Sequence, residues 1–142
     1  MKILVTVGTT RFSSLTEKAR TIGAHDMTLQ HADPSLSFGH VFLDNIEQHY
    51  QDADLVITHA GAGSVFSLLE MGKKIIVVPN LERVDKHQLD LAQHVERNGY
   101  ALVAWEIESL RRCIDDSTNF SPNTYSPTKF FKFEEITEFI YR

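Results

Sequence analysis

The chain has 142 residues, of which 42% are hydrophobic and 23% are charged, as expected for one compact globular domain with its own core. Its formal net charge of -5 at pH 7 argues against the electrostatic attraction by which basic proteins bind nucleic acid or anionic membrane surfaces. A single cysteine, Cys113, excludes an intrachain disulfide and indicates a reducing, cytoplasmic compartment. No segment approaches the roughly 20 apolar residues of a membrane span, so action at a membrane would require a partner.

Short apolar runs alternate with stretches of helical periodicity along the chain. Apolar, β-branched runs that stop at turn residues predict strands, and apolar residues three or four apart predict helices. The pattern is typical of the α/β class, with a Rossmann-like, mostly parallel sheet and helices on both faces. In chain order we expect a strand at Lys2–Val7, a helix at Thr16–Ile22, strands at Met27–Gln30 and Val41–Leu43, a helix at Asn45–Gln51, a strand at Asp54–Thr58, a helix ending at Met71, a strand at Ile75–Val78, a helix at Lys86–Arg97, a strand at Ala101–Ala104 and a helix at Ile107–Asp116.

The clearest unit lies in the middle of the chain. The strand Asp54–Thr58 is followed by a turn with two glycines, an apolar helix, Gly72 and the strand Ile75–Val78. This order predicts a βαβ unit, whose two strands run parallel and are joined by a right-handed crossover. Both strands are apolar almost throughout, as expected where helices cover both faces of a sheet.

The composition changes near the C-terminus. Residues 117–128 are rich in Ser, Thr, Asn and Pro, which predicts a loop or linker. Residues 130–142 return to helical spacing, with Phe133, Ile136 and Ile140 on one stripe. This helix covers the domain's own sheet or docks on a partner protein, and the sequence favours neither. We therefore expect residues 1–142 to form a single domain that ends in a helix.

The loops that follow the predicted strands carry the residues best suited to bind a ligand, because the carboxyl ends of parallel strands share one edge of the sheet. In the βαβ unit, two glycines let the backbone approach a ligand, and the next helix begins with N–H groups that carry partial positive charge. His59 stands at the end of the strand and is able to donate to a phosphate oxygen. The phosphate donors we expect in this loop are Gly61, Ala62, Gly63 and Ser64.

A purely structural role is the alternative for this loop. In that case both glycines only permit a tight turn, and Ser64 caps the helix. No Gly-Lys-Ser/Thr triplet follows the glycines, and the G-x-G-x-x-G spacing is absent, so neither an ATP-binding P-loop nor a dinucleotide fingerprint is predicted. His87, Asp90 and His94 share a helix face but lack a zinc signature, and no metal site is predicted from them.

Four motifs come in the order and spacing of a known family. They are VTVGTT at 5–10, DADLVITHAGAGS at 52–64, GKKIIVVPN at 72–80 and KHQLDLA at 86–92. Together they resemble the C-terminal domain of family 28 glycosyltransferases over residues 2–104. More narrowly, the chain is similar to the free-standing catalytic subunit of the two-part dolichol-pathway UDP-N-acetylglucosamine transferase and to its bacterial counterparts in capsule and exopolysaccharide synthesis. The resemblance implies a fold equivalent to the C-terminal half of a GT-B glycosyltransferase.

The resemblance also implies an enzyme divided between two chains. This half would hold the donor, usually a UDP-sugar, while a membrane-associated subunit binds the lipid-linked saccharide acceptor. The 61–64 loop would hold the donor diphosphate, with His59 as the catalytic residue beside it and with His87 and Gln88 at the nucleotide or sugar. Because N–H dipoles and a histidine stabilise charge on the departing UDP, we expect no metal or other cofactor. The residues that would line the cleft between the subunits are Gly8, Thr9 and Thr10.

The helix after the loop departs from the family pattern. The family commonly has a glutamate for the ribose hydroxyls three residues after the loop serine, where this chain has Ser67. Its nearest carboxylate is Glu70, about one helical turn further on. We keep both residues as candidates for nucleotide binding, although a helix glutamate is equally well explained as a solvated surface group.

The sequence thus predicts the UDP-sugar-binding subunit of an inverting hexosyltransferase that extends a lipid-linked acceptor in bacterial polysaccharide biosynthesis. We expect it to act only with its partner, which would hold it peripherally at the inner membrane. One alternative is a scaffold subunit without catalytic activity that stabilises a membrane-associated glycosyltransferase, favoured by Ser67 in place of the glutamate. Another is an unrelated flavodoxin-like sensor, which would bind a flavin or a purine nucleotide.

Overall fold

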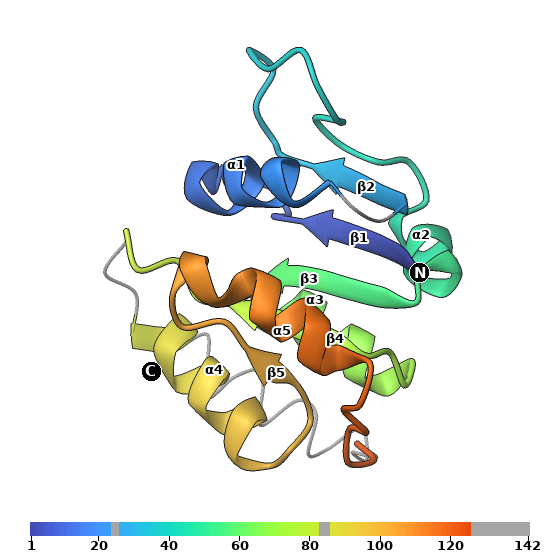
Figure 1. The fold of residues 1–142 in the computed structure, drawn as a ribbon, viewed down its shortest axis with the longest axis vertical. Coiled ribbons are helices and arrows are strands. Elements are labelled where there is room, and N and C mark those ends of the chain that lie inside the picture. The colour runs from blue at the N-terminus through green and yellow to red at the C-terminus, as the bar shows by residue number, and fades with distance from the viewer. Residues whose placement is uncertain (24–25, 83–85, 126–142) are drawn as a thin grey trace.

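The computed structural model describes residues 1–23, 26–82 and 86–125 and contains one five-stranded sheet (Figure 1). The strand order is β2-β1-β3-β4-β5, and every neighbouring pair is parallel. The predicted fold class is thereby confirmed. The strands are β1 (Lys2–Thr6), β2 (Asp26–Gln30), β3 (Leu55–His59), β4 (Ile75–Val78) and β5 (Leu102–Val103). The helices are α1 (Ser13–Ile22), α2 (Ile46–Asp52), α3 (Ala62–Glu70), α4 (Lys86–Arg97), the short 3-10 helix η1 (Ile107–Ser109) and α5 (Leu110–Ser117).

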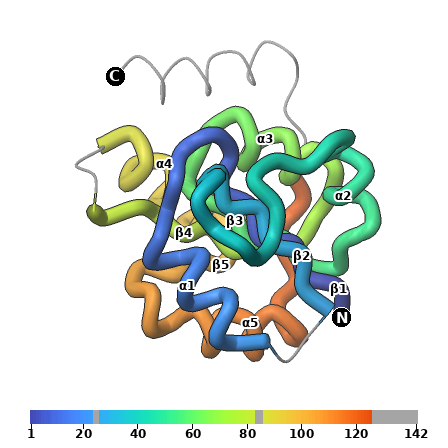
Figure 2. The backbone as a smooth tube through the Cα atoms, turned by 90° about the horizontal axis from the view of Figure 1, so that it is seen from above, coloured from blue at the N-terminus to red at the C-terminus, as the bar shows by residue number. Residues whose placement is uncertain are grey.

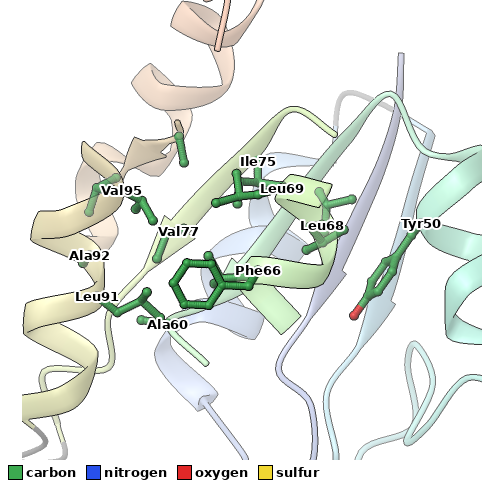
Figure 3. Packing of buried hydrophobic residues seen from close by; sticks show 14 of the residues in the cluster. Tyr50, Ala60, Phe66, Leu68, Leu69, Ile75, Val77, Leu91, Ala92 and Val95 are labelled. Carbon is green, nitrogen blue, oxygen red and sulfur yellow. The ribbon is translucent and has the colours of Figure 1, made fainter. Parts of the chain in front are cut away.

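Helices cover both faces of the sheet. Figure 2, seen from above, shows α1 and α5 on one side of the strands and α3 and α4 on the other. Successive strand residues point to opposite faces, so Ile3 and Val5 pack with α1 and α5, whereas Leu4 packs with α2, α3 and α4. Phe66 of α3 is fully buried in the second cluster, together with Leu91 of α4 (Figure 3). This two-sided burial explains why the central strands are apolar along their whole length.

The sheet changes direction of winding between β1 and β3. The chain passes from β1 through α1 to β2 on one side, and returns through α2 to β3 on the other side of β1. Ligands of doubly wound sheets bind at such a point, outside the carboxyl ends of the strands. The register pairs Thr6 with Thr58 and His59 with Val78. The ends of β1, β3 and β4 therefore lie side by side, as the βαβ pattern predicted.

The strand expected at Val41–Leu43 is wrong. Only one isolated bridge, Gln30 to His40, joins this region to the sheet. The Val41 carbonyl accepts hydrogen bonds from the Ala32 N–H (3.0 Å) and from Gln30 Nε2 (2.8 Å), so loop and side-chain donors take the place of a strand partner. Phe42 is 61% exposed, so its side chain is not packed as one in a strand inside the sheet would be.

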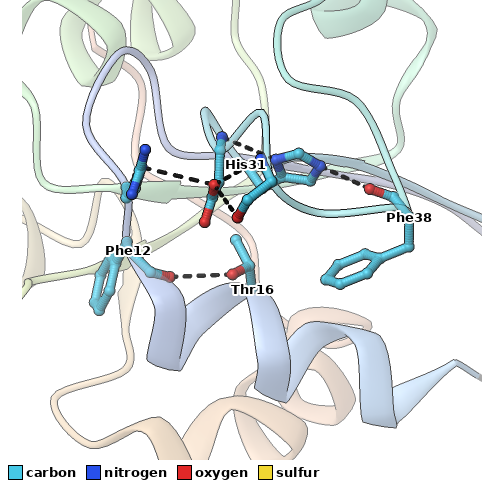
Figure 4. Close-up of polar contacts among 7 residues, drawn as sticks. Phe12, Thr16, His31 and Phe38 are labelled. Carbon is cyan, nitrogen blue, oxygen red and sulfur yellow. Dashed lines mark hydrogen bonds and ion pairs between the residues drawn. The ribbon is translucent and has the colours of Figure 1, made fainter.

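A long connection between β2 and α2 is held by side chains rather than by regular structure. Figure 4 shows the buried His31, whose Nε2 pairs with the Phe38 carbonyl at 2.6 Å. Its Nδ1 accepts the Asp33 N–H at 3.0 Å, and the Arg20 guanidinium lies 4.4 Å from the centre of the Phe38 ring. These contacts hold residues 31–41 against the end of β2 and α1.

The segment after α5 returns along the domain. Ser117, where a loop was expected to begin, is instead the buried last residue of α5. The Asn123 N–H donates to the Gly99 carbonyl at 2.8 Å, and the Tyr125 ring stacks on Phe66 with 5.6 Å between centroids. The helix expected at 130–142 lies outside the described residues. Within the described part of the chain, no helix has the length and apolar character needed to cross a membrane.

Candidate functional site

The turn between β3 and α3 presents backbone donors at the carboxyl edge of the sheet. Gly61 is the N-cap of α3, and the first intrahelical bond runs from the Val65 N–H to the Gly61 carbonyl (2.9 Å). The N–H groups of Ala62, Gly63 and Ser64 therefore have no acceptor within the helix. We also expected the Gly61 N–H to bind phosphate. This was wrong, because it donates to the His59 carbonyl (2.9 Å). Three amides, rather than four, are thus left without an acceptor in the turn or the helix.

The imidazole of His59 lies between the loop after β1, which contains Gly8, and the loop after β3, which contains Gly61. A side-chain carbon at Gly8 would lie 3.0 Å from His59 Cε1, and one at Gly61 would collide with His59 Nε2. Nδ1 lies 3.4 Å from the hydroxyl of Thr58, so Nε2 is the ring nitrogen on the side of α3. The structure thus brings together the loops after β1 and β3, which the sequence had placed on one edge only by topology.

Burial sets the protonation state of His59. The side chain is half-buried, and desolvation lowers the pKa of its imidazole below the ordinary value of 6.5. Hydrogen bonding with the Thr6 backbone raises the pKa and opposes this shift without cancelling it. The ring therefore holds its proton less tightly than an exposed histidine, and in its neutral form it has a single N–H to donate.

The loop after β1 is held from the side of β2. The backbone of Gly8 has φ +67, which favours glycine. Its N–H donates to Gln30 Oε1 (3.1 Å) and its carbonyl accepts from Gln30 Nε2 (2.8 Å), so neither group is free for a ligand. The next two residues, Thr9 and Thr10, are exposed at the sheet edge. Gln30 was not among the predicted residues, because its partners become neighbours only through the strand order.

An open groove of about 540 Å³ runs between α2 and α3. Ser64, Ser67 and Glu70 line it from α3, and the last two are the residues that we named as candidates for nucleotide binding. The purely structural alternative for this loop had Ser64 as the N-cap of the helix, but the N-cap is Gly61. The Ser64 hydroxyl pairs with that of Tyr50, whose pKa is raised mainly by burial, while the Ser64 hydrogen bond lowers it. Tyr50 is a second residue that sequence reasoning missed, since its spacing on α2 indicates only a core position.

The loop between β4 and α4 completes the edge. Gln88 is half-buried, and its Oε1 accepts the N–H of the buried Asn80 at 3.0 Å. It therefore holds this loop against α4. His87 is half-buried on the same helix turn. Throughout residues 1–23, 26–82 and 86–125, no three His, Cys, Asp or Glu side chains are grouped so as to hold a metal ion.

The arrangement provides neutral, preorganised hydrogen-bond donors at a helix N-terminus beside a half-buried histidine. Such donors suit a diphosphate, whose charge they balance through dipoles. The family model of the glycosyltransferase family 28 C-terminal domain matches residues 2–140. The chain belongs to this family. The family match spans β1 to α5, so the glycine loops and the α2–α3 groove all lie within the family 28 domain.

Among curated proteins, the domain is similar to the "UDP-N-acetylglucosamine transferase subunit ALG13" of Homo sapiens, with 34% identity over 118 residues that make up 69% of this chain. The protein of the same name from Yarrowia lipolytica is 34% identical over 87 residues, or 61% of this chain. The matched regions are 10% and 44% of those two proteins. This family 28 domain therefore spans less than half the length of either relative.

Two solved structures share the fold. Acinetobacter baumannii MurG superposes with a TM-score of 0.64 over 98% of this chain and 51% of that protein, at 18% identity. The NMR solution structure of ALG13 gives a TM-score of 0.64 over 99% of this chain and 97% of its own, also at 18% identity. The family 28 domain thus corresponds to about half of MurG and to nearly the whole of the ALG13 structure.

Proposed function

We propose that this chain is the UDP-sugar-binding subunit of an inverting, two-component glycosyltransferase. The observation that carries the proposal is the start of α3, where three N–H groups have no acceptor within the helix, beside His59 and at the switch point of the sheet. The family match and the names of the relatives, which are UDP-N-acetylglucosamine transferase subunits, support a UDP-sugar as donor. N-Acetylglucosamine is therefore the first sugar to test.

The proposed chemistry is charge stabilisation on the leaving group. When the bond between sugar and phosphate breaks, negative charge grows on UDP, and the amides of Ala62, Gly63 and Ser64, which have no acceptor within α3, would stabilise it. His59 lies beside these amides, and a bound anion favours its protonated form, in which both ring nitrogens are donors. These groups can balance the charge without a metal ion. We assign the base that deprotonates the acceptor hydroxyl to the partner chain.

A second subunit is part of the proposal. The relatives are named as subunits, which supports a second chain in the enzyme. We propose that this partner is membrane-associated, binds a lipid-linked saccharide acceptor and brings this chain to the membrane surface. The names of the relatives refer to UDP-N-acetylglucosamine transfer and not to capsule or exopolysaccharide synthesis. The bacterial inner-membrane, capsule or exopolysaccharide setting therefore stays a prediction.

A scaffold without catalytic activity is the second candidate. It is favoured by Ser67, which offers a hydroxyl in the α2–α3 groove where the family commonly has a carboxylate. Glu70 lines the same groove and supplies a carboxylate about one helical turn away. UDP binding alone does not separate the two candidates, whereas transfer in the presence of the partner does.

The first experiment is calorimetric titration of the chain with UDP, repeated with Gly61→Asp and Gly61→Asn. Both substitutions place the same bulk against His59, and only aspartate adds a negative charge beside the donor amides. We expect Gly61→Asp to bind UDP roughly tenfold more weakly than Gly61→Asn, because like charges repel at short distance. Equal affinities of the two variants, or no heat from the unmodified chain at millimolar UDP, would contradict an anion site at α3.

The second experiment separates the enzyme from the scaffold. Sugar transfer is measured in a membrane lysate that contains the partner, after addition of the chain or of His59→Ala or Gln88→Ala. The enzyme predicts that both variants fail to restore transfer although they still associate with the membrane. A scaffold predicts that both restore it fully. Absorbance of the purified chain at flavin wavelengths tests the flavodoxin-like alternative independently.

A further inference from the structure

Gln30, the last residue of β2, places one side-chain amide at the meeting point of three segments. The residue is 3% exposed. Its Oε1 accepts from the Thr6 hydroxyl (2.6 Å), the Val7 N–H (3.0 Å) and the Gly8 N–H (3.1 Å). Its Nε2 donates to the carbonyls of Gly8 and Val41, each at 2.8 Å. Both amide hydrogens and the oxygen are thus used in one buried position.

The first consequence concerns the loop after β1. Gln30 holds both backbone polar groups of Gly8, which fixes the planes of the two peptide bonds that flank it. In a trans peptide the C=O and the N–H point in opposite directions. Because the Gly8 carbonyl points at β2, the N–H of Thr9 points away from β2, toward the β3 side of β1, where His59 lies.

The second consequence concerns the segment that leads into α2. The Val41 carbonyl is held by Gln30, and the backbones of His40 and His31 pair at the end of β2 (2.9 Å). Leu43 and Ile46 follow directly and pack against the cluster that contains α3. Ile46 also lines the α2–α3 groove. The side chain of Gln30 therefore contacts both the loop after β1, which lies beside His59, and the segment leading to Ile46, which lines the groove opposite α3.

We infer that Gln30 is a positioning residue that locks the β1–α1 loop and residues 41–46 into the one arrangement in which both border the donor site. The inference rests on the proposed function for the identity of the ligand. The requirement for glutamine follows from its chemistry. A glutamate of the same shape has no hydrogen to give to the Gly8 and Val41 carbonyls and would place its charge against them.

The test compares Gln30→Glu with the uncharged, similarly shaped Gln30→Met. Gln93→Glu, at an exposed position on α4, controls for the added charge. Gly72→Ala lowers stability at a position with open space around it and controls for destabilisation alone. Two measurements are made on each variant, well below its unfolding temperature. They are the amide and imidazole NMR signals of the chain without nucleotide, and the affinity for UDP by calorimetry.

We expect the Gln30 variants to shift the signals of Thr9, of residues 41–43 and of the His59 ring together, and to weaken UDP binding roughly tenfold or more. In the complete enzyme with its partner, kcat for transfer falls along with the affinity. Both control variants keep the signals and the affinity of the unmodified chain. If Gln93→Glu or Gly72→Ala weakens UDP binding to the same extent, the effect of Gln30 is only structural and the inference is overturned.

The two proposals fail in different ways. If the unmodified chain does not bind UDP, the proposed function fails, and the NMR measurement alone decides whether Gln30 sets both loops. Shifts confined to one of the two segments would then overturn the inference. If the unmodified chain binds UDP and the Gln30 variants bind it equally well, the donor site stands and Gln30 does not position it.

Discussion

A side-chain carbon on Gly8 would lie 3.0 Å from Cε1 of His59. The absence of a side chain at Gly8 is thus what allows the imidazole to lie against the loop after β1. The residue also has φ +67, a backbone conformation that costs other residues about 1–2 kcal/mol. Two separate physical requirements, one of backbone and one of space, therefore favour glycine at this position.

These requirements are separated by Gly8→Ala and Gly72→Ala. Gly72 has φ +72, but a side-chain carbon there would meet nothing within 4 Å. We expect Gly72→Ala to lower the free energy of unfolding by about 1–2 kcal/mol, and Gly8→Ala to lower it by about 1 kcal/mol more, because His59 must move. Urea denaturation of both variants measures the difference. Equal losses would show that His59 gives way without cost.

Stability depends on pH through His59. Burial lowers the pKa of the folded-state imidazole below 6.5, its value when unfolded. Between these two pKa values the unfolded chain binds a proton that the folded chain does not, so stability rises with pH in that window and is level above it. We expect His59→Asn to flatten this part of the profile in urea denaturation from about pH 5 to about pH 8. Profiles with the same slope would contradict the shift.

Gly61 and Gly63 test the two roles of glycine in the β3–α3 turn. Gly61 has φ -93, which any residue adopts, but a side-chain carbon there would collide with His59 Nε2. Gly63 lies in the helix with open space around it. Gly63→Ala is expected to stabilise the fold by about 0.5–1 kcal/mol through helix propensity. Gly61→Ala is expected to destabilise it and to shift the NMR signals of the His59 ring, and unshifted signals would place the ring elsewhere.

The strands of the βαβ unit, and the edge of the sheet at which their following loops meet, could be predicted from the sequence. Apolar β-branched runs fix a buried strand, and parallel strands bring their following loops to one edge. The prediction of a strand at Val41–Leu43 was wrong because three apolar residues do not show whether a neighbouring strand is available to pair with them. Here the Val41 carbonyl is taken by Gln30 and Phe42 is exposed.

The polar supports of the site could not be predicted. Gln30 is separated by 22 residues from Gly8 and by 11 from Val41, and Tyr50 meets Ser64 only because α2 packs beside α3. The Gly61 amide was counted as a ligand donor because the sequence gives no sign that the His59 carbonyl would take it. Such contacts depend on strand order and helix docking, which no local pattern encodes.

Lys73 and Lys74, just before β4, act as caps on two different helices. The Lys73 ammonium donates to the carbonyls of Gln51 (2.8 Å) and Ala53 (3.0 Å), at the end of α2. The Lys74 ammonium donates to the carbonyl of Ser117 (2.6 Å), at the end of α5. Neighbouring residues of an extended chain point to opposite faces of a sheet. Lys73 therefore caps a helix on one face of the sheet, and Lys74 caps a helix on the other. At each helix end the positive charge stabilises the negative end of the helix dipole.

We expect Lys73→Met and Lys74→Met each to lower the free energy of unfolding by about 1 kcal/mol, because each leaves helix-end carbonyls without a charged donor. The same exchange at Lys18, on α1, serves as the control. Hydrogen exchange shows where each loss falls: Lys73→Met speeds exchange in α2, and Lys74→Met in α5. Because the two ammonium groups contact different helices on opposite faces, the losses in the double variant add. A double variant no less stable than either single one would contradict this and show that the two contacts are energetically coupled.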